Sequence, residues 1–180
     1  MLLKQVSEKK SMSSYIIKTV SELIYKYKTR DPFELIKALG IELMFDGNFS
    51  KLKGFYTVMN RQAYIVINAN LPEEKRKIVA AHELGHHMLH KRFATGKVMQ
   101  EFELYDMTAR PEYEANCFAA ELLVPDEEII ELINSGYDME QIASILKTDI
   151  NIIGIKLGNL NDSGKNYNIG ILPKGDFLGK

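Results

Sequence analysis

The feature that most constrains this chain is the pattern His82-Glu83-x-x-His86. On an α-helix, side chains four residues apart lie one above the other, so two imidazoles at this spacing can hold one metal ion. Glu83 follows His82 by about 100° around the helix, which places its carboxylate beside the ion rather than on it. There it can take a proton from an attacking water molecule. The pattern is short enough to occur by chance, and its meaning depends on a helical context.

The surrounding sequence predicts that helix independently of the histidines. Pro72 suits a first helical turn, and the acids Glu73 and Glu74 favour a helix N-terminus. The apolar residues that follow cover nearly every direction around the helix: Ile78, Val79, Ala80, Ala81, Leu84, Met88 and Leu89. A helix that is apolar on all sides is a buried one. Buried polar groups need partners, and a metal ion would satisfy His82, Glu83 and His86 together.

A metallopeptidase site needs a third protein ligand and one open position. A third histidine is not available at the expected spacing, because the tenth residue after His82 is Arg92. His90 lies about 12 Å along the same helix from His82, too far for one ion. We therefore expect His87 and His90 to have structural or supporting roles, and we look for a carboxylate on a second helix, Pro111 to Val124.

Three glutamates of that second helix are candidates, and the helical wheel separates them. Glu112 shares a stripe of small and apolar residues, whereas Glu114 and Glu121 lie about 180–200° away on the expected solvent side. We therefore expect Glu112 to be the third ligand, the alternative being an acid that only stabilises the helix N-terminus. Asn116, one turn later, is placed to hydrogen-bond a ligand from behind or to pack as a helix amide.

These residues resemble a known family. The segment from His82 to His90, followed by Glu112 to Pro125, is similar to the ImmA/IrrE family of bacterial zinc metallopeptidases. The resemblance is firm over residues 70–125 and looser over residues 14–69. It implies a zincin-like core in which His82, His86 and Glu112 bind Zn²⁺, a gluzincin-like ligand set, with Glu83 as the catalytic residue. It also implies an action on a helix-turn-helix repressor in phage, mobile-element or stress regulation.

The remaining pattern predicts an α+β fold. Strands are expected at residues 41–45, 54–59 and 63–68, which are rich in β-branched and aromatic residues and would form a small antiparallel three-stranded sheet beside the metal helix. An exposed edge of that sheet would suit an extended peptide substrate, the alternative being a sheet that only covers the helix. Helices are expected at residues 13–27 and 33–39.

The expected domain organisation has four parts. Residues 1–12 form a loose leader, 13–125 the metallopeptidase-like domain, 126–160 a helix-turn-helix-like appendage, and 161–180 a flexible tail that includes a strand near 167–172. Residues 92–110 lack periodicity, and we expect a long loop over the site. The appendage is net acidic, which argues against DNA binding because phosphate contacts need Lys and Arg.

Composition narrows the class of protein further. The chain has 180 residues, a net charge of −1 and a single cysteine, Cys117, so no disulfide framework is possible within it. It has no apolar run of the length that a membrane span needs and no secretory h-region. The sequence therefore predicts a cytoplasmic protein.

We interpret the chain as a zinc endopeptidase in which Glu83 takes a proton from water and delivers it to the leaving amine. Its predicted partner is a specific protein such as a transcriptional repressor. Tyr105, Tyr113 and His90 are candidate donors to the oxyanion. Two rival hypotheses are a non-hydrolytic regulator that uses the same metal site to sequester a repressor, and a DNA-binding regulator that uses residues 138–160.

Overall fold

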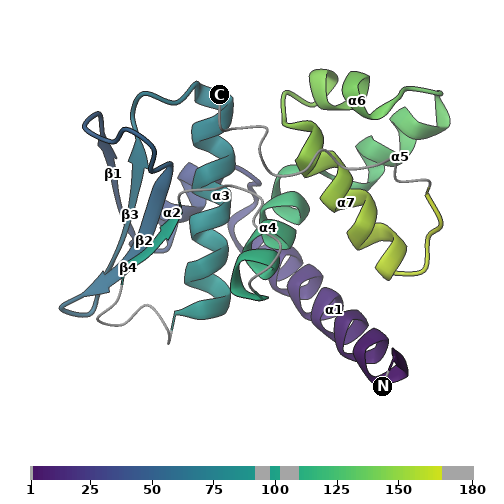
Figure 1. The fold of residues 1–180 in the computed structure, drawn as a ribbon, viewed down its shortest axis with the longest axis horizontal. Coiled ribbons are helices and arrows are strands. Elements are labelled where there is room, and N and C mark those ends of the chain that lie inside the picture. Colours follow the sequence, from purple (N-terminus) through teal and green to yellow (C-terminus); the bar gives the residue numbers. More distant parts are fainter. Residues whose placement is uncertain (1, 92–97, 102–109, 168–180) are drawn as a thin grey trace.

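A computed structural model describes residues 2–91, 98–101 and 110–167. Its elements form successive layers: a sheet, then α3, then α4 together with α1, and finally the C-terminal helices (Figure 1). The helices are α1 (Leu2–Tyr27), α2 (Pro32–Ala38), α3 (Glu73–His90), α4 (Arg110–Leu123), α5 (Asp126–Asn134), α6 (Met139–Ile145) and α7 (Ile150–Asp162). The strands are β1 (Glu42–Asp46), β2 (Gly54–Met59), β3 (Gln62–Asn68) and β4 (Val98–Glu101). The predicted α+β class is confirmed.

The sheet is mixed and four-stranded, in the order β1-β3-β2-β4. β2 pairs antiparallel with both β3 and β4, whereas β1 pairs parallel with β3, Leu43 lying opposite Ile65. The prediction of an antiparallel three-stranded sheet was therefore wrong. The reason lies in β3, whose apolar residues Ile65, Val66 and Ile67 are all buried. Such a strand is stabilised at the centre of a sheet, so it separates β1 from β2.

β4 lies within the stretch that was predicted to be a long loop. Its four residues pair with Gly54–Thr57 of β2, so an available sheet edge, rather than local periodicity, makes them a strand. The rest of the predicted loop, residues 92–97 and 102–109, lies outside the described residues. β4 is next to β2, and β2 packs on α3, so the β4 side of the sheet lies near α3.

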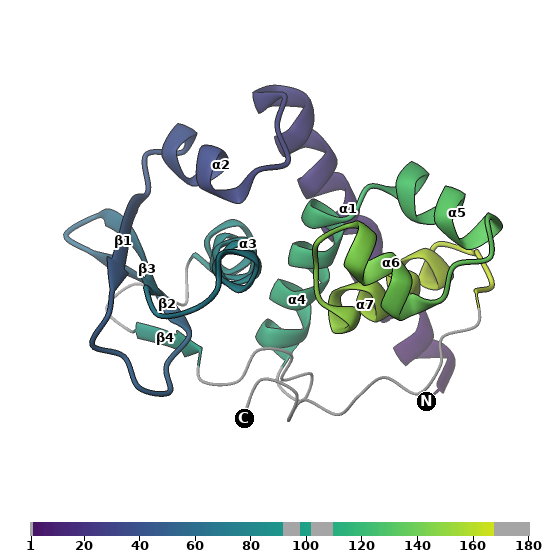
Figure 2. The ribbon, with the colours of Figure 1, turned by 90° about the horizontal axis from the view of Figure 1, so that it is seen from above.

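α3 is the central helix of the molecule. One side packs on β2 and β3, and other sides pack on α4 and α2, as the end-on view of α3 in Figure 2 shows. Burial on all sides, expected from the sequence, is confirmed for Ile78 to His86, with Met88 and Leu89 partly buried. Polar side chains that point from this helix are therefore held among packed neighbours.

α1 and Arg30, which follows it in the chain, support α4. α1 begins at Leu2, so residues 2–12 are helical and the expected loose leader is corrected. Ile16, Val20 and Leu23 form its buried stripe. Between α1 and α2, the Arg30 guanidinium donates to the backbone carbonyls of Glu121 and Leu122, at 3.0 and 3.1 Å. These carbonyls lie in the last turn of α4, where helix carbonyls lack intrahelical partners.

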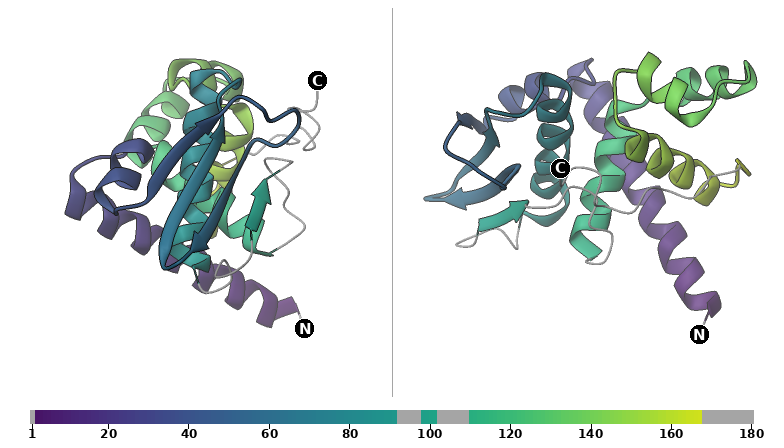
Figure 3. Two further views of the ribbon diagram at one scale, coloured as in Figure 1. Left: turned by 90° about the vertical axis from the view of Figure 1, so that its left-hand side faces the viewer. Right: turned by 45° about the horizontal axis from the view of Figure 1, so that its top comes forward.

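The C-terminal helices form a separate layer on the other side of α4 (Figure 3). α5 ends at Asn134, and Gly136 follows with a positive φ of 84°. α6 starts with a capping box between Asp138 and Gln141, and α7 follows after a short connection. α7 is buried on nearly all sides and packs on α4. The tail beyond Tyr167, with its expected strand, lies outside the described residues.

Within the described residues, no helix combines the length and the apolar character needed to cross a bilayer.

Candidate metal centre

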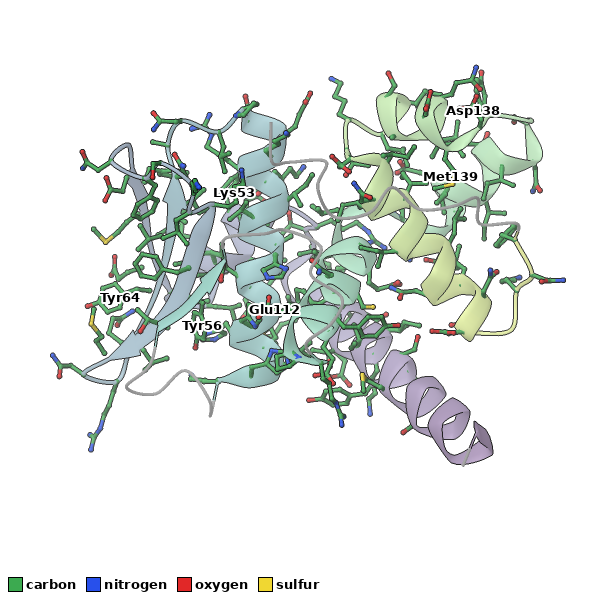
Figure 4. The ribbon with its side chains drawn as sticks, in the orientation of Figure 1. Lys53, Tyr56, Tyr64, Glu112, Asp138 and Met139 are labelled. Atoms are coloured by element: carbon green, nitrogen blue, oxygen red, sulfur yellow. The ribbon has the colours of Figure 1, made fainter. Side chains whose placement is uncertain are left out.

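Three side chains from two helices converge on one point. The Nε2 atoms of His82 and His86 are 3.0 Å apart, and Glu112 Oε2 lies 3.2 Å from the first and 3.3 Å from the second. Figure 4 shows Glu112 reaching from α4 to the side of α3. Among the residues that the structure describes, His82, His86 and Glu112 are the group of three potential ligands close enough to share one metal ion. The sequence predicted these three residues, and the structure brings them together.

The spacing of the three atoms fits a metal ion of the size of zinc. For bonds of about 2.0–2.1 Å in tetrahedral geometry, two ligand atoms lie about 3.3 Å apart. The measured separations of 3.0–3.3 Å are close to this value. Two imidazole nitrogens and a carboxylate oxygen are also ligand types that zinc prefers. The residues present therefore fit a zinc ion.

Gly85 lets the two helices approach closely enough to form this cluster. A Cβ atom at Gly85 would lie 3.1 Å from Ala115 Cα and 3.2 Å from both the Ala115 carbonyl oxygen and Phe118 Cβ. Distances this short are tighter than ordinary side-chain contacts. The glycine stands between the two histidines in sequence, so this close contact of α3 and α4 lies next to the cluster of His82, His86 and Glu112.

His82 is held from behind by Asn116. Its Nδ1 lies 2.9 Å from Asn116 Oδ1, and both residues are buried. An amide oxygen only accepts, so His82 carries its proton on Nδ1 and presents a bare Nε2 to the cluster. The hydrogen bond between Asn116 and a histidine of the cluster is one of the two roles expected for this residue.

His86 has a longer chain of partners. Its Nδ1 lies 3.1 Å from His90 Nδ1, His90 Nε2 lies 2.8 Å from Glu114 Oε2, and Glu114 Oε1 accepts from Arg110 Nε at 2.8 Å. The two ring nitrogens of His90 thus contact His86 and Glu114. The prediction that Glu114 points to solvent was wrong, since its side chain is only 14% exposed.

The error about Glu114 has a structural cause that also applies to Glu121. A helical wheel assigns α4 one buried side, but α4 packs on α3, α1 and α7 at once. Glu114 faces the α1 side, where it borders a cavity together with Met12 and Tyr15. Glu121, also predicted to face solvent, is buried and lies 2.7 Å from Lys156 Nζ on α7. For His90, the sequence feature that could have predicted the contact with His86 was the spacing of four residues between them.

Burial sets the charge states around the cluster. Burial, more than any neighbouring charge, lowers the pKa of His86 to about 4, so its imidazole is neutral near pH 7. Burial alone would raise the pKa of Glu114, but hydrogen bonds from Arg110 and His90 outweigh it and hold that pKa below its usual range. The histidine is therefore ready to act as a ligand, and the carboxylate behind it is ionised.

Glu83, the predicted catalytic residue, is fully buried on α3. Its Oε1 lies 3.5 Å from the position that a Cβ would take at Gly54, the first residue of β2. A side chain at Gly54 would also meet Val79 Cγ1 at 2.6 Å. The missing side chain therefore allows β2 to pack directly on α3 beside the Glu83 carboxylate.

Of the other predicted residues, His87 lies against the sheet. His87 Nδ1 is 3.1 Å from the hydroxyl of Tyr56, a buried residue of β2 that Figure 4 places beside α3. Burial, aided by the charge of Lys91, lowers the pKa of His87 to about 4. Burial, together with Cys117 and Asp162, raises the pKa of Tyr113 above its usual range. Tyr105 lies outside the described residues.

Comparison with known proteins agrees with this geometry. Residues 36–157 match the IrrE N-terminal-like domain (Peptidase_M78). The chain is 40% identical over 124 residues to immunity region protein 2 of Bacillus phage phi105, which covers 69% of this chain and 77% of the phage protein. It is 35% identical over 101 residues to metallopeptidase ImmA of Bacillus subtilis (strain 168). These aligned residues cover 55% of this chain and 57% of ImmA. This chain therefore belongs to the ImmA/IrrE family of metallopeptidases.

Proposed function

We propose that this chain is a cytoplasmic zinc endopeptidase that cleaves a specific protein, such as a helix-turn-helix repressor. The observation that carries the proposal is the convergence of His82, His86 and Glu112 on one point, with the buried carboxylate of Glu83 on the same helix. The family match supports a metallopeptidase, and the donor set and its spacing support zinc as the metal.

In this proposal each polar residue has a defined task. His82, His86 and Glu112 hold the ion. When bound, zinc supplies a Lewis acid that makes water nucleophilic near neutral pH and polarises the scissile carbonyl. Glu83 takes the proton from the attacking water and delivers it to the leaving amine. Its burial keeps bulk water from exchanging that proton.

The sheet offers a place for an extended substrate. β4 is the edge strand next to β2, and its Glu101 lies opposite Gly54, the residue that packs beside Glu83. A peptide that adds to a sheet edge is held through its backbone, which suits an endopeptidase that must extend its substrate. This supports substrate binding along the β4 edge.

The proposed biological setting rests on the relatives. One is named an immunity region protein of a phage, and the other is named metallopeptidase ImmA. These names support a role in regulating a phage or mobile element, in which a repressor is the natural protein target. Burial of α7 on nearly all sides supports a packing role for the helix-turn-helix-like segment, since a DNA-reading helix needs a free face.

The test uses the purified, zinc-loaded protein and the repressor encoded beside it, with the products identified by mass spectrometry. We expect one specific cut, lost on chelation and restored by zinc. Glu83→Gln should bind zinc as before and lower the cleavage rate at least about 100-fold, because it removes the general base. Glu128→Gln, an exposed acid on α5, is the matched control and should cleave normally.

The same variant separates proteolysis from sequestration. Relief of repression that survives in full with Glu83→Gln, while zinc is retained and no cleavage occurs, would contradict the endopeptidase proposal and favour a regulator that only binds its partner.

A further inference from the structure

We propose that His90 and Glu114 are positioning residues that fix the tautomer of His86 and so direct its Nε2 lone pair into the metal cluster. The inference deepens the proposed function, since it rests on His86 being a metal ligand. It assigns a role to two residues outside the ligand set, one on each of the two helices that build the cluster.

The direction of each hydrogen bond can be worked out from Glu114, through His90, to His86. A carboxylate only accepts, so at 2.8 Å from Glu114 Oε2 the proton lies on His90 Nε2. In a neutral imidazole the second ring nitrogen only accepts, and in this form His90 Nδ1 is an acceptor. It lies 3.1 Å from His86 Nδ1, which must therefore donate. His86 is left with a bare Nε2, 3.0 Å from His82 Nε2.

Burial makes this arrangement specific. His86 and His90 are both almost completely buried, and the Glu114 side chain is largely covered. Where water is excluded, the Nε2–H tautomer of His86 would leave two imidazole acceptors facing each other across the Nδ1 contact, at the cost of an unmade hydrogen bond. The Nδ1–H tautomer instead leaves the bare Nε2 atoms of His82 and His86 facing each other, 3.0 Å apart, an arrangement that a metal ion would satisfy. The carboxylate therefore selects one proton arrangement through two imidazoles.

The hydrogen-bond partners behind His86 also differ in charge from the partner behind His82. His82 donates to a neutral amide, Asn116, whereas His86 donates through His90 to a carboxylate. A negative partner increases the basicity of a ligating imidazole, and loss of such partners lowers metal affinity by about 10–100-fold. His86 is therefore the histidine whose ligand strength Glu114 controls.

The outer end of the chain of contacts reaches the surface. Glu114 and Arg110 border a cavity of about 630 Å³ that α1 and Leu89 complete. The Arg110 side chain is 76% exposed, so its ion pair with Glu114 is weak in water. Arg110 should therefore matter much less than Glu114, and this difference provides an internal control.

The direct test is the tautomer of His86 in metal-free protein, read from two-bond ¹H–¹⁵N spectra of histidine-labelled samples. We expect the Nδ1–H form in the natural protein and a mixture, or the Nε2–H form, in Glu114→Leu and His90→Phe. Glu114→Gln keeps an acceptor oxygen at the same place and should retain the Nδ1–H form. A natural protein with His86 as Nε2–H, or no change in either disruptive variant, would overturn the proposal.

The second readout is the zinc dissociation constant from competition with a chromophoric chelator. It should rise about 10–100-fold in Glu114→Leu and in His90→Phe, and less than about 5-fold in Glu114→Gln and Arg110→Gln. Glu128→Gln should match the natural protein. Equal constants in Glu114→Leu and Glu128→Gln would contradict the inference.

The two readouts keep this inference separate from the proposed function. The tautomer is measured without metal or substrate, so failure to find a cleaved protein would leave it standing. A protein that cleaves its substrate but shows no tautomer change in the variants would support the proposed function and remove this inference.

Discussion

Each histidine of the metal cluster is held by a hydrogen bond on the nitrogen that faces away from the cluster. Asn116 supports His82, and His90 supports His86. A ring that is free to rotate or change tautomer would lose entropy on binding a metal, whereas these two rings are already oriented. At the proposed metal site, we therefore expect the affinity for metal to depend on residues that do not touch the ion.

Asn116 provides the first prediction at this scale. Asn116→Leu removes the acceptor for His82 Nδ1, so the zinc dissociation constant should rise about 10–100-fold, whereas Asn116→Asp keeps an acceptor and should largely preserve it. Asn159→Leu is the control, because Asn159 is another buried amide that contacts α4, through the Cys117 carbonyl. If both leucine variants weaken zinc binding equally, the effect comes from lost packing and not from the support of His82.

His87 provides a prediction about pH. Its pKa is about 4 in the folded protein, below the ordinary 6.5, so between these values the unfolded chain binds a proton that the folded chain does not. Stability should therefore fall as the pH decreases from 6.5 to 4. In His87→Gln, measured in metal-free protein by urea unfolding, this fall should be smaller by up to about 2 kcal/mol. Equal slopes in the two proteins would contradict the assigned burial effect.

At the scale of elements, the contact between α3 and α4 determines whether the site forms. Glu112 belongs to α4, and it reaches the histidines because Gly85 leaves no side chain between the two helices. The positions of Glu112 and Asn116 could be predicted from helical periodicity. The role of Gly85 could not, because a glycine within a helix has several explanations until the neighbouring backbone is known.

The glycine contact gives a prediction with a matched control. Gly85→Ala places a Cβ 3.1–3.2 Å from the Ala115 backbone, so α4 must shift. Zinc affinity should fall, and the usual gain from replacing a helical glycine should be cancelled. Gly158→Ala on α7 meets nothing within 4 Å and should raise the free energy of unfolding by about 0.5–1 kcal/mol. Unchanged zinc affinity in Gly85→Ala would show that α4 can move without opening the cluster.

The errors of the sequence-based predictions also arise from contacts between elements. The helix that carries the two histidines and the placement of Glu112 beside them follow from periodicity and side-chain chemistry, which are local properties. The pairing of β1 with β3, the strand β4 and the burial of Glu114 depend instead on which surfaces meet in the folded chain. Glu114 in particular was predicted from one buried face of its helix, whereas α4 is covered from three sides.

At the scale of the whole molecule, the layers are tied to one another through α4. α3 and the sheet lie on one side of it, α1 covers a second, and α7 covers a third. Polar contacts reach α4 from both directions: Arg30 donates to its last carbonyls, and Lys156 of α7 pairs with Glu121. The C-terminal helices therefore support the helix that supplies Glu112, which connects stability of the outer layer with the metal site.

Lys156 is the residue through which this connection is best tested. It is fully buried, lies 2.7 Å from Glu121 Oε2 and also pairs with Asp126. Lys156→Met leaves the buried Glu121 carboxylate uncompensated, so the free energy of unfolding should fall by about 3 kcal/mol in urea titrations. The double variant Lys156→Met/Glu121→Leu removes both charges and should recover most of that loss. Because Glu121 lies about 14 Å along α4 from Glu112, the folded double variant should keep its zinc affinity. A double variant as unstable as the single one would show that Lys156 acts through packing of its side chain and not through its charge.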